Sequence, residues 1–135
     1  MKPLTNFDLI DYAKELKIPN FRGVFMRDTL PKRIREKECG IMNLNTSQQN
    51  GSHWVAYYKN AKDRVYFDSF GCITPIELQQ YMKTKTEFVN NINCIQRNTE
   101  QIQKPNTNIC GHLCLYVLKT LSNDKNFQSI INSLY

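Results

Sequence analysis

Cys110 has the sequence context in which a thiol becomes a nucleophile. It stands between a polar loop, residues 98–109, and the most apolar stretch of the chain, residues 110–121, which predicts a buried helix. A thiol at a helix N-terminus feels the positive end of the helix dipole, so its pKa falls and its thiolate fraction rises. The alternative, a cysteine that only begins a buried helix, stays open at this point.

A nucleophilic thiol needs a general base, and the chain has only two histidines. His112 lies two residues after Cys110 and on the other side of the expected helix, so it cannot serve that thiol. His53 remains. It opens a segment rich in aromatic and β-branched residues, 53–59, and a similar segment, 64–70, follows after a short turn.

An aspartate faces His53 if these two segments form a hairpin centred between Asn60 and Ala61. Asp68 then lies directly opposite, and cross-strand neighbours have Cβ atoms about 4.5–5.5 Å apart. At that distance the carboxylate can accept a hydrogen bond from the imidazole, fix its tautomer and stabilise the imidazolium ion. The register is a hypothesis, because a slip of one residue would separate the pair. An ordinary surface pair is the alternative interpretation.

A carboxamide that could stabilise an oxyanion belongs to Gln103, seven residues before Cys110 with a proline between them. A glutamine amide and the nucleophile's own backbone N–H can together form an oxyanion hole. Gln101 is a neighbouring glutamine for which we expect no such role. The pattern therefore predicts acyl-transfer chemistry at Cys110, with the structural alternative kept beside it.

The cysteines as a set favour free thiols. There are five, an odd number, and the N-terminus shows no apolar secretory signal. Cys110 and Cys114 are four residues apart, but no second ligand pair follows at zinc-finger spacing, so we expect no metal. Cys114 should be unreactive packing one turn inside the helix. The others are Cys39, Cys72 and Cys94.

Four helices are expected to position these residues. Each has a capping residue or apolar residues at three- and four-residue spacing. The expected helices are 5–18 capped by Thr5 or Asn6, a helix from Thr74 through Met82 with Pro75 at N1 and Glu77 in a capping box, 110–121, and a last helix capped by Asn123 or Asp124.

Strands are expected at 38–45, 53–59, 64–70 and 92–97, separated by polar loops and turns. Residues 21–37 look irregular, because glycine, aspartate and proline interrupt them. The order of one helix, three strands, a helix, a strand and two helices predicts an α+β domain. Its small mixed or antiparallel sheet would be flanked by helices.

Length and composition fit a single domain over residues 1–135. Apolar residues make up 41% of the chain and charged residues 22%, which excludes a disordered tail, a collagen-like rod and a disulfide miniprotein. No run approaches the roughly 18 apolar residues of a membrane span. The net charge of +6 includes a basic cluster that could contact polyanions or could be a solvated loop: Lys32, Arg33, Arg35 and Lys37.

The order of the candidate residues resembles the adenain-type cysteine proteases, the adenovirus maturation protease and its relatives in large DNA viruses and virus-like transposons. The matching pieces are Gly51-Ser52-His53-Trp54-Val55-Ala56, Phe67-Asp68-Ser69-Phe70-Gly71 and Gln103-Lys104-Pro105-Asn106-Thr107-Asn108-Ile109-Cys110-Gly111. The glutamine-to-cysteine spacing of seven is closer to the adenoviral enzymes than to the ubiquitin-like-protein-specific proteases, which share their fold. The resemblance covers at least residues 38–118, and residues 21–31 resemble the N-terminal part of transposon-encoded members.

This resemblance implies a papain-like or adenain-like fold and a cysteine endopeptidase with its nucleophile at a helix N-terminus. The implied roles are Cys110 as nucleophile, His53 as general base and acid, Asp68 as orienting acid and Gln103 as oxyanion-hole donor. Trp54 and Gly111 would contact substrate, although Trp54 could equally pack in the core. The adenoviral enzyme carries glutamate in place of Asp68 and is longer by a C-terminal part.

The same resemblance implies partners. The substrates would be viral capsid or core precursor polypeptides, and the chemistry would require no cofactor. In adenoviruses a short viral peptide activates the protease through a disulfide, and DNA stimulates it. Cys94 is placed like the cysteine used there, although it could instead pack under the sheet, and the net charge of +6 is compatible with DNA. We expect a monomer that acts in the virion and the host nucleus or cytoplasm, without secretion or membrane contact.

Two other functions remain open. One is a deconjugating protease for a ubiquitin-like modifier, for which 135 residues leave little contact surface. The other is a basic nucleic-acid-binding module that is not an enzyme, in which Cys110 is purely structural. The reactivity of that thiol separates the enzymes from the binding module.

Overall fold

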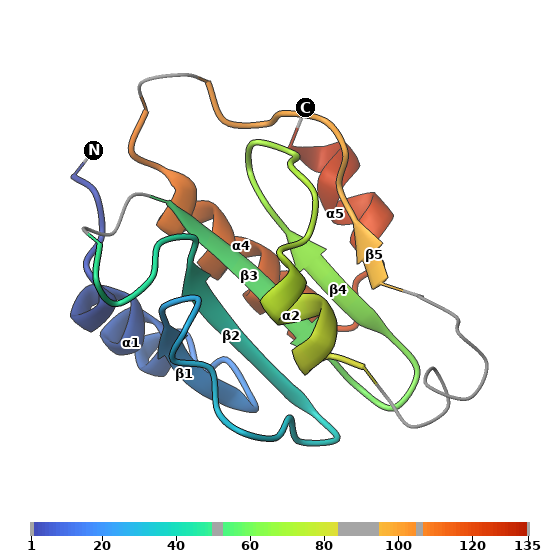
Figure 1. Ribbon diagram of the computed structural model, residues 1–135. Helices are drawn as coiled ribbons and strands as arrows, with labels where there is room; N and C mark the ends of the chain where they lie inside the picture. Colours follow the sequence, from blue (N-terminus) through green and yellow to red (C-terminus); the bar gives the residue numbers. More distant parts are fainter. Residues whose placement is uncertain (1, 50–52, 84–94, 105–106, 135) are drawn as a thin grey trace.

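A five-stranded sheet with helices on both faces organises the chain (Figure 1). The computed structural model describes residues 2–49, 53–83, 95–104 and 107–134. The strands follow one another in the sheet in sequence order, as β1 (Phe21–Phe25), β2 (Glu38–Asn43), β3 (Trp54–Lys59), β4 (Arg64–Phe67) and β5 (Ile95–Arg97). The two outer pairs are parallel and the two inner pairs antiparallel, which confirms the expected mixed sheet.

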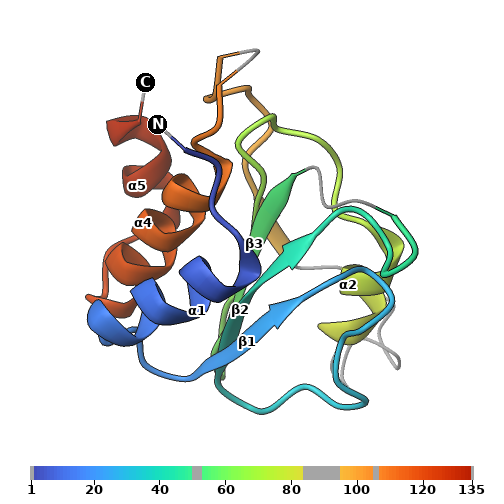
Figure 2. The same ribbon diagram turned by 90° about the vertical axis from the view of Figure 1, so that its left-hand side faces the viewer.

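The helices form two unequal layers. Three of them, α1 (Asn6–Glu15), α4 (Cys110–Ser122) and α5 (Phe127–Ser133), cover one face, and α2 (Ile76–Tyr81) covers the other (Figure 2). A hydrophobic core lies on each face of the sheet. Successive residues of a strand point to opposite faces, so β3 contributes to both cores. Ala56 packs toward α4, while Val55 and Tyr57 pack toward α2.

The β3–β4 hairpin forms as expected, but its register differs by two residues from the expected one. Ala56 lies opposite Phe67 instead of Val65. The turn explains the difference, because the Asn60 side chain accepts hydrogen bonds from two backbone N–H groups, those of residues 62 and 63. A displacement by two preserves the face of every side chain, so His53 and Asp68 still share one face.

Residues 21–25 form the edge strand β1, although the sequence predicted irregular structure there. β1 pairs with β2 on one side, and its register shifts between Phe21 and Gly23. Gly23 adopts a φ of 152°, which L side chains rarely reach, so this irregularity requires glycine. The glycine that suggested a loop is therefore the residue that lets this strand bend.

The cap expected for α2 is wrong. The helix begins after Pro75, and no side chain caps it. The Glu77 carboxylate, expected to complete a capping box with Thr74, instead pairs with Arg27 at 2.9 Å. This long-range ion pair removes the acceptor that a local capping box needs, and it joins α2 to the segment after β1.

The expected cap of α1 is confirmed, and the expected cap of α5 is wrong. Thr5 caps α1 in a reciprocal capping box with Asp8, and this helix ends earlier than expected. The cap of α5 is Asn126, whose side chain accepts a hydrogen bond from the backbone of the first turn. Neither Asn123 nor Asp124 caps α5, because the former ends α4 and the latter has a φ of 62°.

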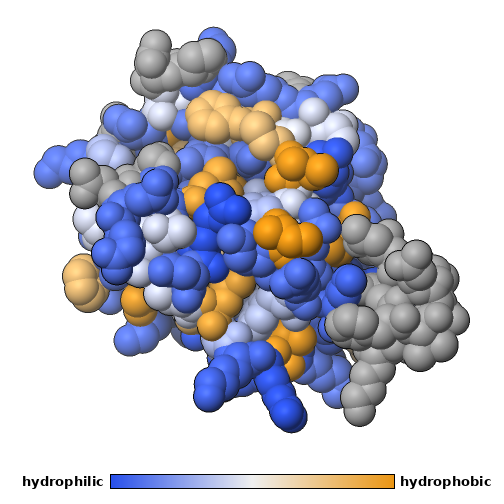
Figure 3. All heavy atoms as spheres, in the orientation of Figure 1, coloured by the Kyte–Doolittle hydropathy of each residue, from blue (hydrophilic) through white to orange (hydrophobic). Residues whose placement is uncertain are grey.

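The visible surface is mostly hydrophilic. Figure 3 shows apolar residues in small separate groups on this face, surrounded by polar and charged ones. Among the described residues, no helix is long and apolar enough to cross a membrane.

Candidate active site

Three stretches of chain converge at one end of the sheet. His53 directly precedes β3, Asp68 directly follows β4, and Cys110 is the first residue of α4. The start of β3 and the end of β4 are neighbours because the pair is antiparallel. Figure 1 shows the start of α4 beside the start of β3. The topology thus brings a thiol, an imidazole and a carboxylate together.

The imidazole of His53 is held on two sides. Its Nε2 lies 2.7 Å from Oδ1 of Asp68, and both side chains are buried. The ring also stacks on Phe70, with centroids 4.6 Å apart and planes 27° apart. The backbone N–H of Phe70 donates to the same carboxylate oxygen at 2.8 Å. These contacts leave the imidazole one orientation, with the opposite ring nitrogen available to Cys110.

The backbone of Asp68 is itself clamped by Asn98. The Asn98 side chain donates to the carbonyl of Asp68 at 2.6 Å and accepts from its N–H at 3.1 Å. Asn98 directly follows β5 and is buried. Sequence reasoning missed this residue, and its position in a polar loop carries no signal for the role.

The Cys110 thiol is half-buried, and its pKa is lowered. Burial alone would raise its pKa, but the hydrogen bond and charge of His53, together with hydrogen bonds from the backbone of Trp54 and Gly111, hold that pKa below its usual value. The N-terminal position in α4 adds the favourable helix dipole. Cys110 is therefore the described cysteine whose surroundings favour a thiolate.

The pKa of His53 moves in the complementary direction. Burial would lower it, yet hydrogen bonds and charges from Asp68 and Cys110 raise the pKa to about 9. Near neutral pH the lowered thiol pKa and the raised imidazole pKa favour a thiolate–imidazolium pair. Such a pair contains both a nucleophile and a proton donor.

The Gln103 carboxamide faces the same site and is almost fully buried. Its Oε1 accepts from the Ser69 hydroxyl at 2.6 Å, and its Nε2 donates to the carbonyl of Thr107 at 2.7 Å. Nε2 carries two hydrogens, so one donor remains beyond the bond to Thr107. Gln101 differs, since its amide bonds the backbone carbonyl of Gln103.

A cavity of about 640 Å³ contains these groups. His53, Gln103 and Cys110 form part of its polar wall, and the apolar wall includes Leu4 and Trp54. The Trp54 indole donates to the carbonyl of Leu4 at 2.9 Å, so the segment before α1 is fastened alongside the cavity. The space is large enough for several residues of an extended peptide.

Trp54 and Gly111 are placed differently from each other. Trp54 lines the cavity and also packs against the larger core. Its position is therefore compatible with both substrate contact and core packing. Gly111 is buried, and a Cβ there would meet Leu9 at 3.2 Å and Leu4 at 3.4 Å. Packing explains why glycine is needed at this position, and a substrate contact at Gly111 stays a prediction.

The other cysteines that the structure describes lie apart from this chemistry. Cys114 is fully buried, its Sγ lies 3.5 Å from the carbonyl of Trp54, and burial raises its pKa well above the usual value. Cys39 is buried and Cys72 is exposed. Cys94 lies outside the described residues. Within the part of the chain that the structure describes, no three His, Cys, Asp or Glu side chains gather as metal ligands.

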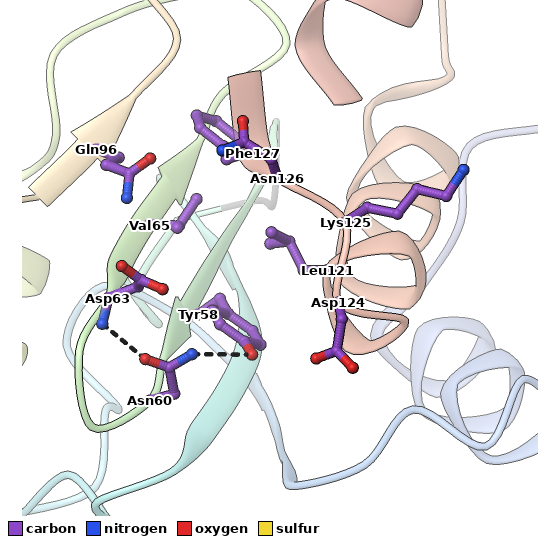
Figure 4. A pocket seen from close by; sticks show the side chains of 10 residues that line it. All are labelled: Tyr58, Asn60, Asp63, Val65, Gln96, Leu121, Asp124, Lys125, Asn126 and Phe127. Carbon is purple, nitrogen blue, oxygen red and sulfur yellow. Dashed lines mark hydrogen bonds between the residues drawn. The ribbon is translucent and has the colours of Figure 1, made fainter. Parts of the chain in front are cut away.

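A second cavity, of about 290 Å³, lies between the β3–β4 turn and the α4–α5 connection (Figure 4). Asp63 and Asp124 contribute carboxylates, and Lys125 points away from the other labelled side chains. Neither a thiol nor an imidazole is among its lining residues. It therefore lacks the groups for the chemistry available at Cys110.

The fold matches that of a protease of known structure. The crystal structure of the ASFV pS273R protease matches 96% of this chain and 61% of its own, with a TM-score of 0.60 and 15% identity. A selenomethionine crystal structure of the same protease gives a TM-score of 0.61 at 18% identity.

The sequence places the chain in a protease family. The model of the adenovirus endoprotease family matches residues 21–133, and the chain belongs to this family. The protease of porcine adenovirus A serotype 3 is 26% identical over 127 residues, with 84% of this chain and 62% of the relative covered. The protease of bovine adenovirus 2 is 30% identical over 113 residues, with 76% and 51% covered. The chain thus matches only about half to three fifths of each relative's length.

Proposed function

We propose that residues 1–135 form one domain that acts as a cysteine endopeptidase on polypeptides, with viral capsid or core precursors as substrates. Family membership supports an endoprotease, and one observation carries the mechanism. That observation is the contact of Cys110 with a histidine whose other ring nitrogen, Nε2, lies 2.7 Å from a buried carboxylate. This arrangement can activate a thiol and return a proton to a leaving group.

Acylation follows from the proposed roles. The Cys110 thiolate attacks the carbonyl carbon of the scissile peptide bond, forming a C–S bond while the carbonyl electron pair moves to oxygen. The free N–H of Gln103 and the backbone N–H of Cys110, in the first turn of α4, would stabilise this oxyanion. The His53 imidazolium then protonates the leaving nitrogen, the C–N bond breaks, and a thioester remains.

Deacylation reverses the proton flow. Neutral His53 takes a proton from water, and the resulting hydroxide attacks the thioester carbonyl. The C–S bond breaks, the acid product leaves, and the thiolate–imidazolium pair is restored. Asp68 keeps the imidazole in place and stabilises its charged form throughout. The side chains of this mechanism require no metal or organic cofactor.

Active-site labelling tests the proposal directly. A peptidyl vinyl sulfone should form one adduct, located at Cys110 by mass spectrometry, and His53→Ala should slow its formation. Cys72→Ser is the matched control, because it removes an exposed thiol outside the cavity and should leave labelling unchanged. Labelling of Cys110 no faster than of Cys72 at pH 7 would falsify the thiolate mechanism.

Substrate class needs a separate comparison. Short glycine-containing peptides should be hydrolysed, and a fluorogenic ester of a ubiquitin-like modifier should not. Turnover of the modifier ester alone would indicate that the same site belongs to a deconjugating protease. A Cys110→Ala variant that retains full nucleic-acid binding, together with an unreactive wild-type thiol, would favour the binding module.

Regulation and environment complete the proposal. We expect a monomer acting in the virion and the host nucleus or cytoplasm. Peptide activation through Cys94 and stimulation by DNA are the regulatory proposals. Adding DNA, or a cysteine-containing peptide with and without reductant, should raise turnover if they are correct. Cys94→Ser should abolish only the reductant-sensitive part of that response.

A further inference from the structure

We infer that Ser69 is a positioning residue that holds the Gln103 carboxamide in the orientation an oxyanion-hole donor needs. The inference rests on the proposed function and concerns the same site. Ser69 is fully buried, and its hydroxyl donates to Oε1 of Gln103 at 2.6 Å. Within the described residues, no hydrogen bond joins the Ser69 side chain to Cys110 or His53. Any effect of Ser69 on turnover would therefore pass through Gln103.

The two ends of the Gln103 amide are distinguished by their partners. A backbone carbonyl such as that of Thr107 can only accept, so the amide must turn Nε2 toward it, at 2.7 Å. Oε1 then faces Ser69, whose hydroxyl supplies the donor that this buried oxygen requires. Together the contacts select one of the two near-equivalent orientations of the terminal torsion.

The Ser69 backbone supports the same geometry. Its carbonyl accepts from the N–H of Ile102 at 2.8 Å and from the N–H of Gln103 at 2.9 Å. The main chain of the glutamine is thus fixed against the residue that also fixes its side chain. Without the hydroxyl, Oε1 would be a buried acceptor that has lost its donor, which favours reorientation of the carboxamide.

The neighbouring residue performs the matching task for the imidazole. Asp68 orients His53, and Ser69 orients Gln103, so adjacent residues after β4 set the base and the oxyanion donor. Asn98 clamps the backbone of this pair at Asp68. One short segment, residues 68 and 69, can therefore fix the positions of the imidazole and the carboxamide relative to each other.

The decisive experiment is a double-mutant cycle between Ser69→Ala and Gln103→Ala, read by steady-state kinetics on a peptide substrate. Ser69→Ala alone should lower kcat roughly 5- to 30-fold with KM changed less than about twofold. On the Gln103→Ala background the same change should have almost no further effect, since its target is gone. A merely structural role predicts equal losses on both backgrounds.

Alkylation of Cys110 provides the second readout. Iodoacetamide reports the thiolate without using the oxyanion hole, so its rate and pH dependence in Ser69→Ala should match the wild type. Ser69→Thr keeps a hydroxyl and should retain most of kcat. The matched control is Ser122→Ala, which removes a hydroxyl that bonds the carbonyl of Lys119 in its own helix.

The outcomes separate this inference from the proposed function. Wild-type kcat in Ser69→Ala, or additive losses in the cycle, would overturn the role of Ser69 while leaving the protease intact. A wild-type protein that neither cleaves peptides nor alkylates faster at Cys110 than at Cys72 would overturn the function itself. If Ser69→Ala does not fold, Ser69→Cys supplies a weaker donor at similar volume, and the same cycle decides.

Discussion

The charges of Cys110 and His53 depend on each other, and this coupling determines the behaviour of the site at the scale of single residues. Each partner stabilises the charged form of the other, so one lowered and one raised pKa are two views of one interaction. Asp68 adds a second anion beside the imidazole. The lowered pKa of Cys110 and the raised pKa of His53 therefore favour an ion pair at pH values where a free cysteine and a free histidine would both be neutral.

This coupling predicts a pH profile. Because the His53 pKa is raised from 6.5 to about 9, the imidazolium persists through neutral pH and is lost as pH rises through 9. Acylation needs that proton, so kcat/KM for peptides should fall above about pH 9. The acidic fall should track protonation of the Cys110 thiolate. A profile that declines already at pH 7 would contradict the ion pair, and iodoacetamide rates across the same range provide the check.

The stability of the protein should follow the same group. A histidine with a raised pKa stabilises the folded state fully below the unfolded value of 6.5 and loses that contribution as pH rises toward 9. Chemical unfolding of His53→Ala, compared with the wild type at pH 6 and pH 10, isolates this contribution. The difference between the two proteins should shrink at the higher pH.

Gln103→Ala separates turnover from binding. Removing one oxyanion donor should lower kcat by about 10²–10³ because the charge develops only in the transition state. The Michaelis constant should change little, since the ground-state carbonyl gains little from the donor. Gln128→Ala, at an exposed position of α5, is the matched control. A raised KM with unchanged kcat would assign Gln103 to substrate binding instead.

At the scale of elements, the site depends on strand ends that are held from outside their own hairpin. Asp68 lies beyond β4, where ladder hydrogen bonds no longer hold it, and Asn98 after β5 supplies the missing partners. β5 is parallel to β4, so residues that follow the two strands lie at the same edge of the sheet. The residue that follows the short strand β5 thereby holds the backbone of Asp68.

Asn98→Ala should damage both the fold and the activity. It leaves the N–H of Asp68 without its Asn98 acceptor, while the carbonyl keeps the bond from the Gly71 N–H at 2.8 Å, so the free energy of unfolding should fall by about 1–3 kcal/mol. Urea unfolding and kcat measure the two effects. Asn132→Ala, at an exposed position of α5, is the control and should change neither. Loss of stability with wild-type kcat would show that the clamp does not position the acid.

Much of the site could be predicted from the sequence because its members follow from local rules. The start of a buried helix locates Cys110, and the two-residue periodicity of strands locates His53 and Asp68 on one face despite the displaced register. Asn98 and Ser69 could not be predicted, because their roles are long-range contacts from irregular segments. β1 was missed because its pairing compensates for a glycine that weakens every local signal.

At the scale of the whole molecule, a buried carboxylate joins the sheet to α2 at a distance from the cavity. Glu38 on β2 accepts hydrogen bonds from Arg22 on β1 at 2.8 Å, Tyr57 on β3 at 2.5 Å and Tyr81 on α2 at 2.7 Å. Gly40 leaves room for this network, since a Cβ there would lie 2.7 Å from the Tyr57 ring. One carboxylate thus connects four elements.

Glu38 should make the fold sensitive to acid. Burial would raise its pKa, but hydrogen bonds from Tyr57, Tyr81 and Arg22 outweigh burial and hold the pKa below its model-compound value of 4.5. Its contribution is therefore present above pH 4.5 and is lost as pH falls below it. Glu38→Gln should lower stability at pH 7 by about 2 kcal/mol and flatten the acid dependence below pH 4.5. Circular dichroism during acid titration measures both.

Trp54 is the chain's single tryptophan, and it lines the cavity that contains Cys110 and His53, beside Leu4. Intrinsic fluorescence excited at the indole band therefore reports one location only. A peptide entering the cavity would displace water from that ring and shift its emission. The fluorescence of Trp54 can therefore report whether the cavity is occupied. Stopped-flow fluorescence would then measure the rate of peptide binding without an added dye.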